Sequence, residues 1–404
     1  MFRNRIKRII LSGLCLTACS LSVPAKGGEG LYTRIPFEWD AAGQYVVTLK
    51  TPGGSARFLF DTGSPGVIVR RSFAQASGAS CRDTGRYIYD YTNRRVAVET
   101  AMLDSLCVGE ILFRHVQADV LPDSLDGWSR CQGYDGIIGG SILRNLVVAI
   151  DPREGWIVLT DDIGRLGRLG RKNSVRFVRA GGNGVVVPLR VSGGGRQGAH
   201  WACIDTGSSK YACRDDQFSA LQQQGVWQGV QTARGLEADY GLVEADRLEK
   251  VYRRAVAGVL TLAGAKMENV PVESSFGGIS TLGREVLEQG RMVIDYPRRR
   301  FYFIPYRQPA VFRPAFVNIR WRYDGGRIVV ASVWGNVPEG VSPGDRIVSV
   351  DGKDCRRIGL CEYFRLSLRE GTSIEVETAD GSLRTVIVRT QGIEDIFSGE
   401  KACF

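Results

Sequence analysis

Short apolar stretches separated by glycine-bearing turns run along most of the chain, and this pattern predicts a protein built mainly from β-strands. Residues 45–49 read Tyr-Val-Val-Thr-Leu, a Pro-Gly-Gly turn follows at residues 52–54, and a second apolar run ends at Phe60. The same order returns at residues 185–191, 193–195 and 201–204. We therefore expect two similar β-rich units in one chain.

Each unit carries the tetrapeptide Asp-Thr-Gly-Ser directly after its second apolar run, at residues 61–64 and 205–208. Further landmarks recur in the same order: Ile138-Gly139 returns as Leu282-Gly283, and Asp151 returns as Asp295. The distances from Asp61 to Asp205, from Gly139 to Gly283 and from Asp151 to Asp295 are all 144 residues. A chance repeat would not keep this spacing, so the chain contains an internal duplication.

The duplicated motifs resemble the two halves of an aspartic peptidase, and the resemblance covers roughly residues 31–305. It implies a mainly β, pseudo-twofold, two-lobed acid-protease β-barrel fold with a catalytic carboxyl pair between the lobes. Position by position, the resemblance assigns catalysis to Asp61 and Asp205, bracing of the two loops to Thr62 and Thr206, tight turns beneath the pair to Gly63 and Gly207, hydrogen bonds to the outer carboxylate oxygens to Ser64 and Ser208, and support of the loops to Ile138, Gly139, Leu282 and Gly283.

Two adjacent carboxyl groups can supply an acid and a base at once. Neighbouring like charges do not both form readily, so such a pair shares one proton over a broad pH interval. The ionised member can take a proton from water while the protonated member polarises the scissile carbonyl, and no metal, cofactor or covalent intermediate is required. Donation by the hydroxyls of Ser64 and Ser208 to the charged form would lower the pair's pKa values, which predicts an optimum on the acid side of neutral.

Other functions are less well supported by the composition. With His115 and His200 as the only two histidines in 404 residues, neither a zinc site nor a Ser-His-Asp triad is indicated. The net charge of +10 comes partly from the glycine- and arginine-rich residues 164–172, which we interpret as a solvated connection between the lobes. Nucleic-acid binding would require interleaved aromatic residues or a known module. A protein that keeps the fold but only binds peptides stays open as an alternative.

A cleft in which water is the nucleophile needs segments that cover it. The flap candidates of lobe one are Tyr87, Tyr89 and Tyr91, in a hairpin that starts 26 residues after Asp61. In lobe two, residues 234–236 lie at a comparable distance from Asp205. This spacing resembles the retropepsin-like branch more than the pepsin-like one. The alternative is that the tyrosines simply alternate on a half-buried strand.

A separate pattern occupies the C-terminal part of the chain. Residues 341–352 resemble the Gly-Asp-x-Ile stretch of PDZ domains, and an amphipathic segment at residues 360–368 and strands at 373–378 and 383–388 follow. The resemblance implies a small α+β domain that captures the C-terminus of a polypeptide at a sheet edge. The usual glycine-rich loop of PDZ domains is not evident, and residues 323–326 are its nearest candidate. A purely structural role therefore stays open.

The N-terminus has the pattern of an export signal. Basic residues precede an apolar run at residues 9–18, which is too short to span a bilayer. Residues 16–19 resemble a bacterial lipobox, which implies lipidation of Cys19 and attachment to a membrane in the periplasm or at the outer membrane. Cleavage near residues 23–25, with release of a soluble protein, is the alternative.

Export would place the cysteines in an oxidising compartment, so we expect disulfides. Of the ten cysteines, the pairs Cys203 with Cys213 and Cys355 with Cys361 are expected from their proximity in sequence, and free buried thiols are the alternative.

The expected organisation is a signal at residues 1–19, a tether at 20–30, lobe one at 31–160, a connection at 161–184, lobe two at 185–308, a PDZ-like domain at 312–391 and a tail at 392–404. The expected function is that of an exported aspartic endopeptidase that acts as a monomer on polypeptides, without a cofactor or a nucleic-acid partner.

Overall fold

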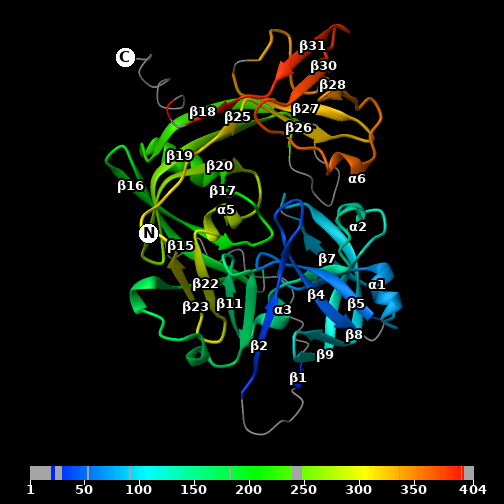
Figure 1. Ribbon diagram of the computed structural model, residues 1–404, viewed down its shortest axis with the longest axis vertical. Helices are drawn as coiled ribbons and strands as arrows, with labels where there is room; N and C mark the ends of the chain where they lie inside the picture. Colours follow the sequence, from blue (N-terminus) through cyan, green and yellow to red (C-terminus); the bar gives the residue numbers. More distant parts are fainter. Residues whose placement is uncertain are drawn as a thin grey trace.

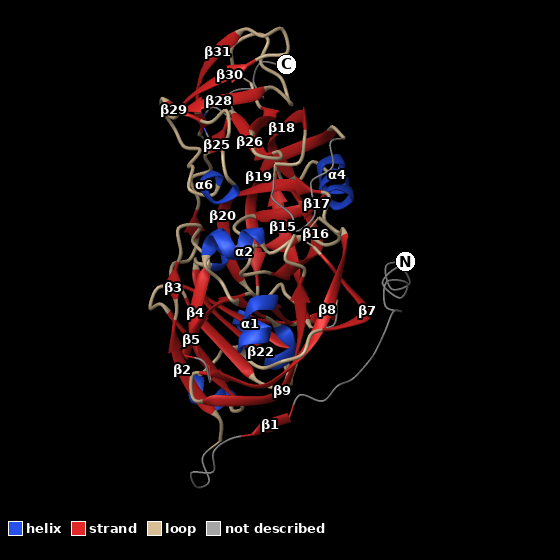
Figure 2. Ribbon diagram, turned by 90° about the vertical axis from the view of Figure 1, so that its right-hand side faces the viewer, coloured by secondary structure: helices blue, strands red, loops and turns tan. Residues whose placement is uncertain are grey.

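The computed structural model describes residues 20–22, 30–51, 54–90, 92–181, 183–238, 248–335, 337–392 and 394. The predicted signal with Cys19, most of the tether, Tyr91 and most of the C-terminal tail lie outside the described residues. Among the residues that are described, no helix is long and apolar enough to cross a membrane. The molecule is elongated, and the C-terminal domain lies at one end, next to lobe two (Figures 1 and 2).

Strands dominate the described part of the chain, which confirms the prediction of a mainly β fold. There they form sheets of nine, six, fifteen and two strands. The nine-stranded sheet belongs to lobe one and contains β1 (Ser20–Ser22), β3 (Glu38–Trp39), β4 (Tyr45–Thr51), β5 (Gly54–Phe60), β6 (Val67–Arg70), β7 (Arg82–Tyr89), β8 (Arg95–Val108), β9 (Ile111–Leu121) and β10 (Gly136–Ile138).

The largest sheet begins in lobe two and continues into the C-terminal domain. Its lobe-two strands are β14 (Val178–Ala180), β15 (Gly184–Gly193), β16 (Arg196–Ile204), β17 (Tyr211–Arg214), β18 (Trp227–Gly235), β19 (Lys250–Leu262), β20 (Ala265–Ser275) and β21 (Thr281–Leu282), with β24 (Ala310–Val311) at β20. Its C-terminal strands are β26 (Ile319–Tyr323), β27 (Ile328–Val333), β28 (Arg346–Val350), β29 (Lys353–Asp354), β30 (Ser373–Glu377) and β31 (Leu383–Ile387). Beside it, β25 (Phe316–Val317) pairs with β32 (Thr390–Gln391).

Helices are short in the described residues. They are α1 (Arg71–Ala76), α2 (Gly127–Gln132), α3 (Gly140–Leu143), α4 (Asp215–Gln223), α5 (Arg284–Leu287) and α6 (Leu360–Tyr363), together with the 3₁₀ turns η2 (Ile163–Leu166) and η3 (Arg171–Asn173). The duplication extends to them, because α1 and α4 begin 144 residues apart, and so do α3 and α5.

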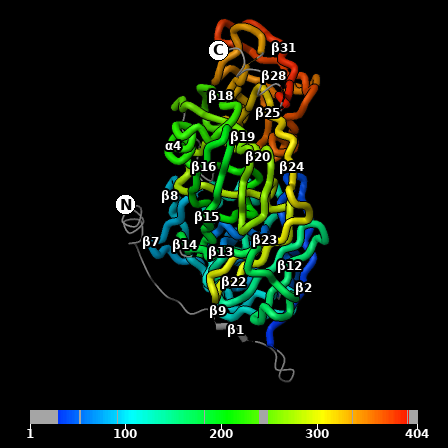
Figure 3. Tube along the Cα trace, turned by 90° about the vertical axis from the view of Figure 1, so that its left-hand side faces the viewer, coloured from blue at the N-terminus to red at the C-terminus, as the bar shows by residue number. Residues whose placement is uncertain are grey.

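Both lobes contribute three strands to the six-stranded sheet, whose order is β13 (Ser174–Arg176), β23 (Arg300–Pro305), β22 (Gly290–Asp295), β11 (Val147–Asp151), β12 (Trp156–Thr160) and β2 (Tyr32–Pro36). Figure 3 shows the side of the molecule on which β13, β23, β22, β12 and β2 are labelled. At its centre β11 pairs with β22, and Ala149 lies opposite Val293. These two residues are equivalents in the duplication. The pseudo-twofold axis therefore passes through this pair of residues.

Every residue of β11 is buried, because the sheet is covered on both faces. Val148 and Ile150 contribute to the main core, whereas Val147 and Ala149 face a smaller cluster that includes Ile163, Leu166 and Leu169. The segment that we predicted to be a solvated connection therefore covers the outer face of the sheet. Its end also forms β13 and β14. Sequence composition alone did not show this, because the arginines and glycines mask the three spaced apolar residues.

The C-terminal domain is joined to lobe two by strand pairing. Gly235 at the end of β18 pairs with Ser332 of β27, and the amide of Leu236 donates to the carbonyl of Ala331 over 2.7 Å. Strand β27 also pairs with β26 and β28, so it is an interior strand. Residues 323–326, the nearest candidate for a peptide-binding loop, form a tight hairpin that the Asp324 amide closes on the Arg327 carbonyl over 2.9 Å.

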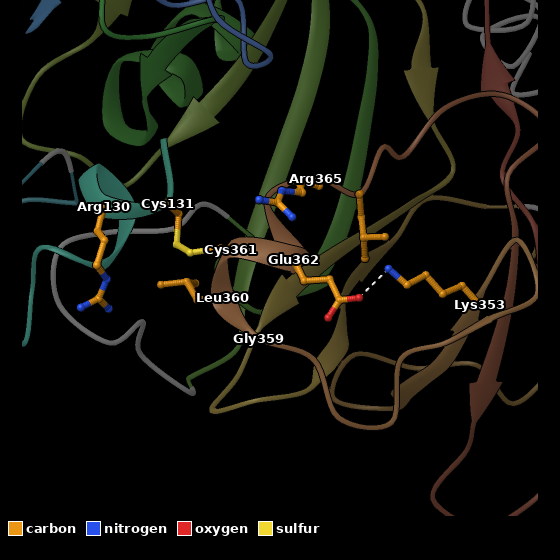
Figure 4. A pocket seen from close by; sticks show the side chains of 9 residues that line it. Arg130, Cys131, Lys353, Gly359, Leu360, Cys361, Glu362 and Arg365 are labelled. Carbon is orange, nitrogen blue, oxygen red and sulfur yellow. Dashed lines mark ion pairs between the residues drawn. A yellow bond between two sulfur atoms is a disulfide. The ribbon is translucent and has the colours of Figure 1, made fainter. Parts of the chain in front are cut away.

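A disulfide between Cys131 and Cys361 joins α2 of lobe one to α6 of the C-terminal domain, as Figure 4 shows. The predicted pairs are therefore wrong: Cys203, Cys213 and Cys355 are free and buried. Cys203 and Cys213 lie on β16 and β17, which β21 separates in the sheet. The bridge lines a pocket of about 540 Å³ with Leu360 and the ion pair between Lys353 and Glu362 at 2.5 Å. Proximity in sequence was a poor guide because the bridge spans 230 positions.

Removing this bridge is expected to lower the stability of the docked C-terminal domain. The bridge closes a long loop, so the double variant Cys131→Ser/Cys361→Ser should lose about 3 kcal/mol of unfolding free energy. Thermal unfolding under non-reducing conditions measures the loss. Cys107→Ser is the control, because Cys107 is a partly exposed free thiol. An unchanged melting temperature for the double variant would show that the bridge contributes nothing to docking.

Candidate active site

Each of the two aspartates predicted to be catalytic follows a buried strand, and a hydrogen bond to a neighbouring strand holds it in place. Asp61 follows β5, and its amide donates to the carbonyl of Ile138 over 2.9 Å. Asp205 follows β16, and its amide donates to Leu282 in the same way over 3.1 Å. In both lobes the supporting strand, β10 or β21, runs parallel to the strand that carries the aspartate. The predicted loop-supporting residues are therefore in contact with the loops they were expected to hold.

Two buried threonines lock the catalytic loops together. The amide of Thr62 donates to Oγ1 of Thr206 over 3.0 Å, and the amide of Thr206 donates to Oγ1 of Thr62 over 3.1 Å. Each hydroxyl then donates to a carbonyl of the opposite strand, at Ile204 or Phe60, over 2.8 Å. Both side chains are fully buried, and each hydroxyl donates one hydrogen bond and accepts another across the two loops, so the separation of the loops is fixed.

The two carboxyl groups meet at the centre of this arrangement and hydrogen-bond to each other. The amide of Gly63 donates to Oδ1 of Asp61 over 2.8 Å, and the amide of Ser208 donates to Oδ1 of Asp205 over 3.0 Å. Each carboxyl group also lies against the glycine of the opposite loop. A Cβ atom on Gly63 would be 2.5 Å from Cγ of Asp205, and one on Gly207 would be 2.7 Å from Cγ of Asp61.

The predicted role of the serine hydroxyls is wrong. Oγ of Ser64 donates to the carbonyl of Gly66 over 3.0 Å, and Oγ of Ser208 donates to the carbonyl of Lys210 over 3.4 Å. Backbone amides, not hydroxyls, hold the carboxylate oxygens. The turn after each aspartate already directs its amides at the carboxylate, as is usual for an Asp side chain in a turn. The argument for an acid-side optimum from the two serines therefore no longer holds.

Burial dominates the electrostatics of the pair. It raises the pKa of Asp61 and of Asp205, and the negative charge of Asp61 raises the pKa of Asp205 further. Backbone amides of the two loops oppose the shift only in part. The pair therefore retains a shared proton to a higher pH than isolated aspartates would, and the singly protonated form extends toward neutral pH.

These shifts predict how stability depends on pH. From about pH 4 up to the raised pKa of the pair, the folded protein holds a proton that the unfolded chain has released, so the unfolding free energy falls as pH rises. Asparagine at position 205 carries no proton to release, so Asp205→Asn removes this loss of unfolding free energy. We expect the variant to be more stable than the wild type by about 1–3 kcal/mol near neutral pH and by less near pH 4. Thermal unfolding at both pH values tests this. Equal stabilisation at both would contradict it, and the exposed Asp104→Asn is the control.

The glycines of the supporting strands are packed directly against the catalytic loops. A Cβ atom on Gly139 would lie 2.4 Å from the carbonyl oxygen of Ser64, and one on Gly283 would lie 2.7 Å from that of Ser208. No side chain fits at either position without moving a backbone carbonyl, which explains the residue type at both.

The predicted flap hairpin of lobe one, β7 and β8, contacts lobe two. Nη2 of Arg94 at its tip donates to Oε2 of Glu237 over 2.7 Å, and the neighbouring Asn93 lies against Gly278. Of the tyrosines, Tyr87 lies under the guanidinium of Arg95 at 3.6 Å. Tyr89 is 60% exposed. The lobe-two counterpart, at Gly235, is instead paired with the C-terminal domain.

Sequence reasoning missed a buried arginine behind the second loop. Nη1 of Arg284 donates to Oε1 of Gln44 over 2.6 Å and to the carbonyl of Thr206 over 3.0 Å. Gln44 in turn donates to the carbonyl of Gly207 over 3.0 Å. The duplication held a signal, because the residue that follows the supporting glycine is Gly140 in one copy and Arg284 in the other. A cation at one of two otherwise matched positions indicates a role that the lobes do not share.

One comparison with known proteins, the match to a family model, agrees with this geometry. A family model described as aspartyl protease matches residues 47–142, which include the first catalytic loop and its supporting strand. Among solved structures, Basic 7S globulin from soybean matches with a TM-score of 0.42 and 12% sequence identity, over 68% of this chain and 95% of that chain. A search of curated proteins found no match. The chain thus contains an aspartic-peptidase-like domain.

Proposed function

We propose that the protein is an aspartic endopeptidase. The observation that carries the proposal is the contact between the carboxyl groups of Asp61 and Asp205, each held by amides of its own loop and packed against the glycine of the other. A pair of carboxyl groups that shares one proton in a buried, symmetric setting can act as base and acid in the same step.

In the proposed reaction a water molecule lies between the carboxyl groups. The ionised carboxylate takes one proton from this water, whose oxygen bonds to the carbonyl carbon of the scissile peptide. The protonated carboxyl group gives its proton to the carbonyl oxygen, which yields a neutral tetrahedral diol. The carboxyl group that took the proton from water then gives it to the peptide nitrogen, and the other carboxylate takes a proton from a diol hydroxyl as the C–N bond breaks. A carboxylic acid and an amine are released, and the pair again holds one proton. Bracing by Thr62 and Thr206 keeps the two groups at a fixed separation throughout.

We further propose that the chain is exported, with Cys19 as its lipid-bearing residue, and that the C-terminal segment is a PDZ-like domain. Strand β27 is an interior strand, and residues 323–326 form a closed hairpin. Both features favour a structural role for this domain, as an extension of the lobe-two sheet, over capture of a peptide at β27.

Cleavage of an unbiased peptide library by the mature protein, from about pH 3 to about pH 8, tests the proposal. We expect cuts within peptides that persist in the presence of a metal chelator and of reagents that modify serine or cysteine nucleophiles. If the folded protein cuts no peptide at any pH, the proposal fails. The alternative is then a catalytically silent lipoprotein that binds peptides.

A further inference from the structure

A partly buried ion cluster connects the C-terminal domain with the second of the two aspartate loops, and its Lys210 side chain is 47% exposed. Its centre is Glu273 on β20, whose side chain is 17% exposed. Nζ of Lys210 lies 3.1 Å from Oε1 and 3.3 Å from Oε2 of this carboxylate. The guanidinium of Arg320, on β26 of the C-terminal domain, donates to the same Oε1 atom. One carboxylate is thus shared between a cation of lobe two and a cation of the neighbouring domain.

The charges in this cluster depend on each other. Although burial alone would favour the neutral acid, Arg320 and Lys210 lower the pKa of Glu273 to about 2, so the carboxylate is ionised at any pH at which the protein would work. The side chain of Arg320 is 16% exposed. Glu273 and Arg320 are the less exposed members, so removing Arg320 leaves the Glu273 carboxylate with Lys210 as its remaining partner in this cluster, and the two side chains must then rearrange or admit water.

Lys210 belongs to the catalytic loop as much as to the cluster. Its carbonyl accepts the amide of Gly283 over 3.0 Å and the hydroxyl of Ser208 over 3.4 Å. The amide of Ser208 in turn donates to Oδ1 of Asp205 over 3.0 Å. A displacement of Lys210 is therefore transmitted to the carboxyl group of Asp205 through Ser208.

The duplication supplies an internal comparison. Strands β17 and β20 place Glu273 beside Ala212, and the equivalent strands of lobe one place Asp119 beside Ile68. Asp119 is also paired with an arginine, but with Arg86 of its own lobe at 2.5 Å. The position that corresponds to Lys210 is Gly66, which carries no charge. Within the described residues, a link of this kind between the carboxylate and the aspartate loop is found in lobe two, where the C-terminal domain docks.

We propose that Glu273 is a positioning residue, through which Arg320 of the C-terminal domain holds Lys210 and the loop that carries Asp205. This inference rests on the proposed peptidase function for its kinetic consequences. The C-terminal domain contacts no reacting atom in this proposal. When it is docked, Arg320 fixes Glu273 and Lys210, and these fix the position of the Asp205 carboxyl group.

Arg320→Gln is expected to lower kcat about tenfold and to change KM less than about twofold, because a misplaced catalytic group slows the chemical step more than it weakens binding. Arg320→Lys keeps the cation and should restore most of kcat. Arg384→Gln, on the exposed strand β31 of the same domain, is the matched control and should match the wild type. Equal kcat in Arg320→Gln and the wild type would overturn the inference while leaving the proposed function intact.

Hydrogen exchange of the intact protein provides a readout that does not depend on activity. In Arg320→Gln the amides of residues 208–211 should exchange at least about tenfold faster than in the wild type, whereas the amides of residues 62–64 in lobe one should not change. If the wild type cleaves no peptide, this comparison still decides the inference. Unchanged protection of residues 208–211, or an equal loss in both loops, would refute a specific link.

Discussion

Asn in place of either Asp61 or Asp205 is expected to reduce kcat/KM by roughly 1,000-fold or more, because neither asparagine can exchange the proton that the pair shares. The amide group is nearly the same size as the carboxyl group, so the hydrogen bonds within each loop and the threonine bracing should persist. Steady-state cleavage of a peptide chosen from the library measures the effect. Single and double variants should be equally inactive, because the two groups act as one unit.

Asp104→Asn, an exposed substitution on β8, is the control for this experiment and should retain full activity. Circular dichroism and thermal unfolding should show all variants folded. Substantial activity in either single variant would mean that the carboxyl pair is not the catalytic centre. The structure would then be that of a binding protein with an acid-protease fold.

Alanine at Gly63 or at Gly207 is expected to lower kcat/KM by about 100-fold and to destabilise the protein by about 1–3 kcal/mol. The new Cβ atom would lie 2.5 Å or 2.7 Å from the Cγ atom of the opposite aspartate, and no carbon atoms approach so closely without a bond. The carboxyl groups must therefore move apart. Kinetics on the same peptide and thermal unfolding measure both effects.

Gly66→Ala is the matched control, because Gly66 lies in the same loop and a Cβ atom there would have Oγ of Ser141 as its nearest neighbour at 3.7 Å, an ordinary contact. We expect this variant to keep its activity and stability. If Gly63→Ala behaved like Gly66→Ala, the close approach of the two loops seen in the structure would be incorrect.

Much of the candidate site could be predicted because the chain carries two copies of the motif that forms it. The shared spacing between Asp61 and Gly139 and between Asp205 and Gly283 identified both loops and their supports. The contacts within each loop depend on short strands and turns, and the residues that favour these elements lie close together in the sequence. The role of the serines was predicted wrongly. Backbone amides donate to the carboxylate oxygens that we assigned to the serine hydroxyls, and a sequence motif does not show which way backbone amides point.

The contacts between distant segments could not be predicted. Cys131 meets Cys361 only because the C-terminal domain docks beside α2, and nothing in the sequence near either residue reports that docking. The same holds for Arg320 and Glu273. Arg254 illustrates the difficulty: it is almost fully buried, yet an arginine in a strand is usually taken for a surface residue. In the structure its guanidinium packs on Trp334 and bonds the carbonyl of Val317.

The register of the six-stranded sheet also bears on the origin of the chain. Ala149 faces Val293, so equivalent positions of the two halves meet at the centre of the sheet. An antiparallel strand that pairs with its own copy about a twofold axis has this register. Two identical copies of one half would pair in the same way. Because the two halves belong to one chain, they need not be identical, and one half carries Arg284 and Lys210 where the other has glycine at both positions.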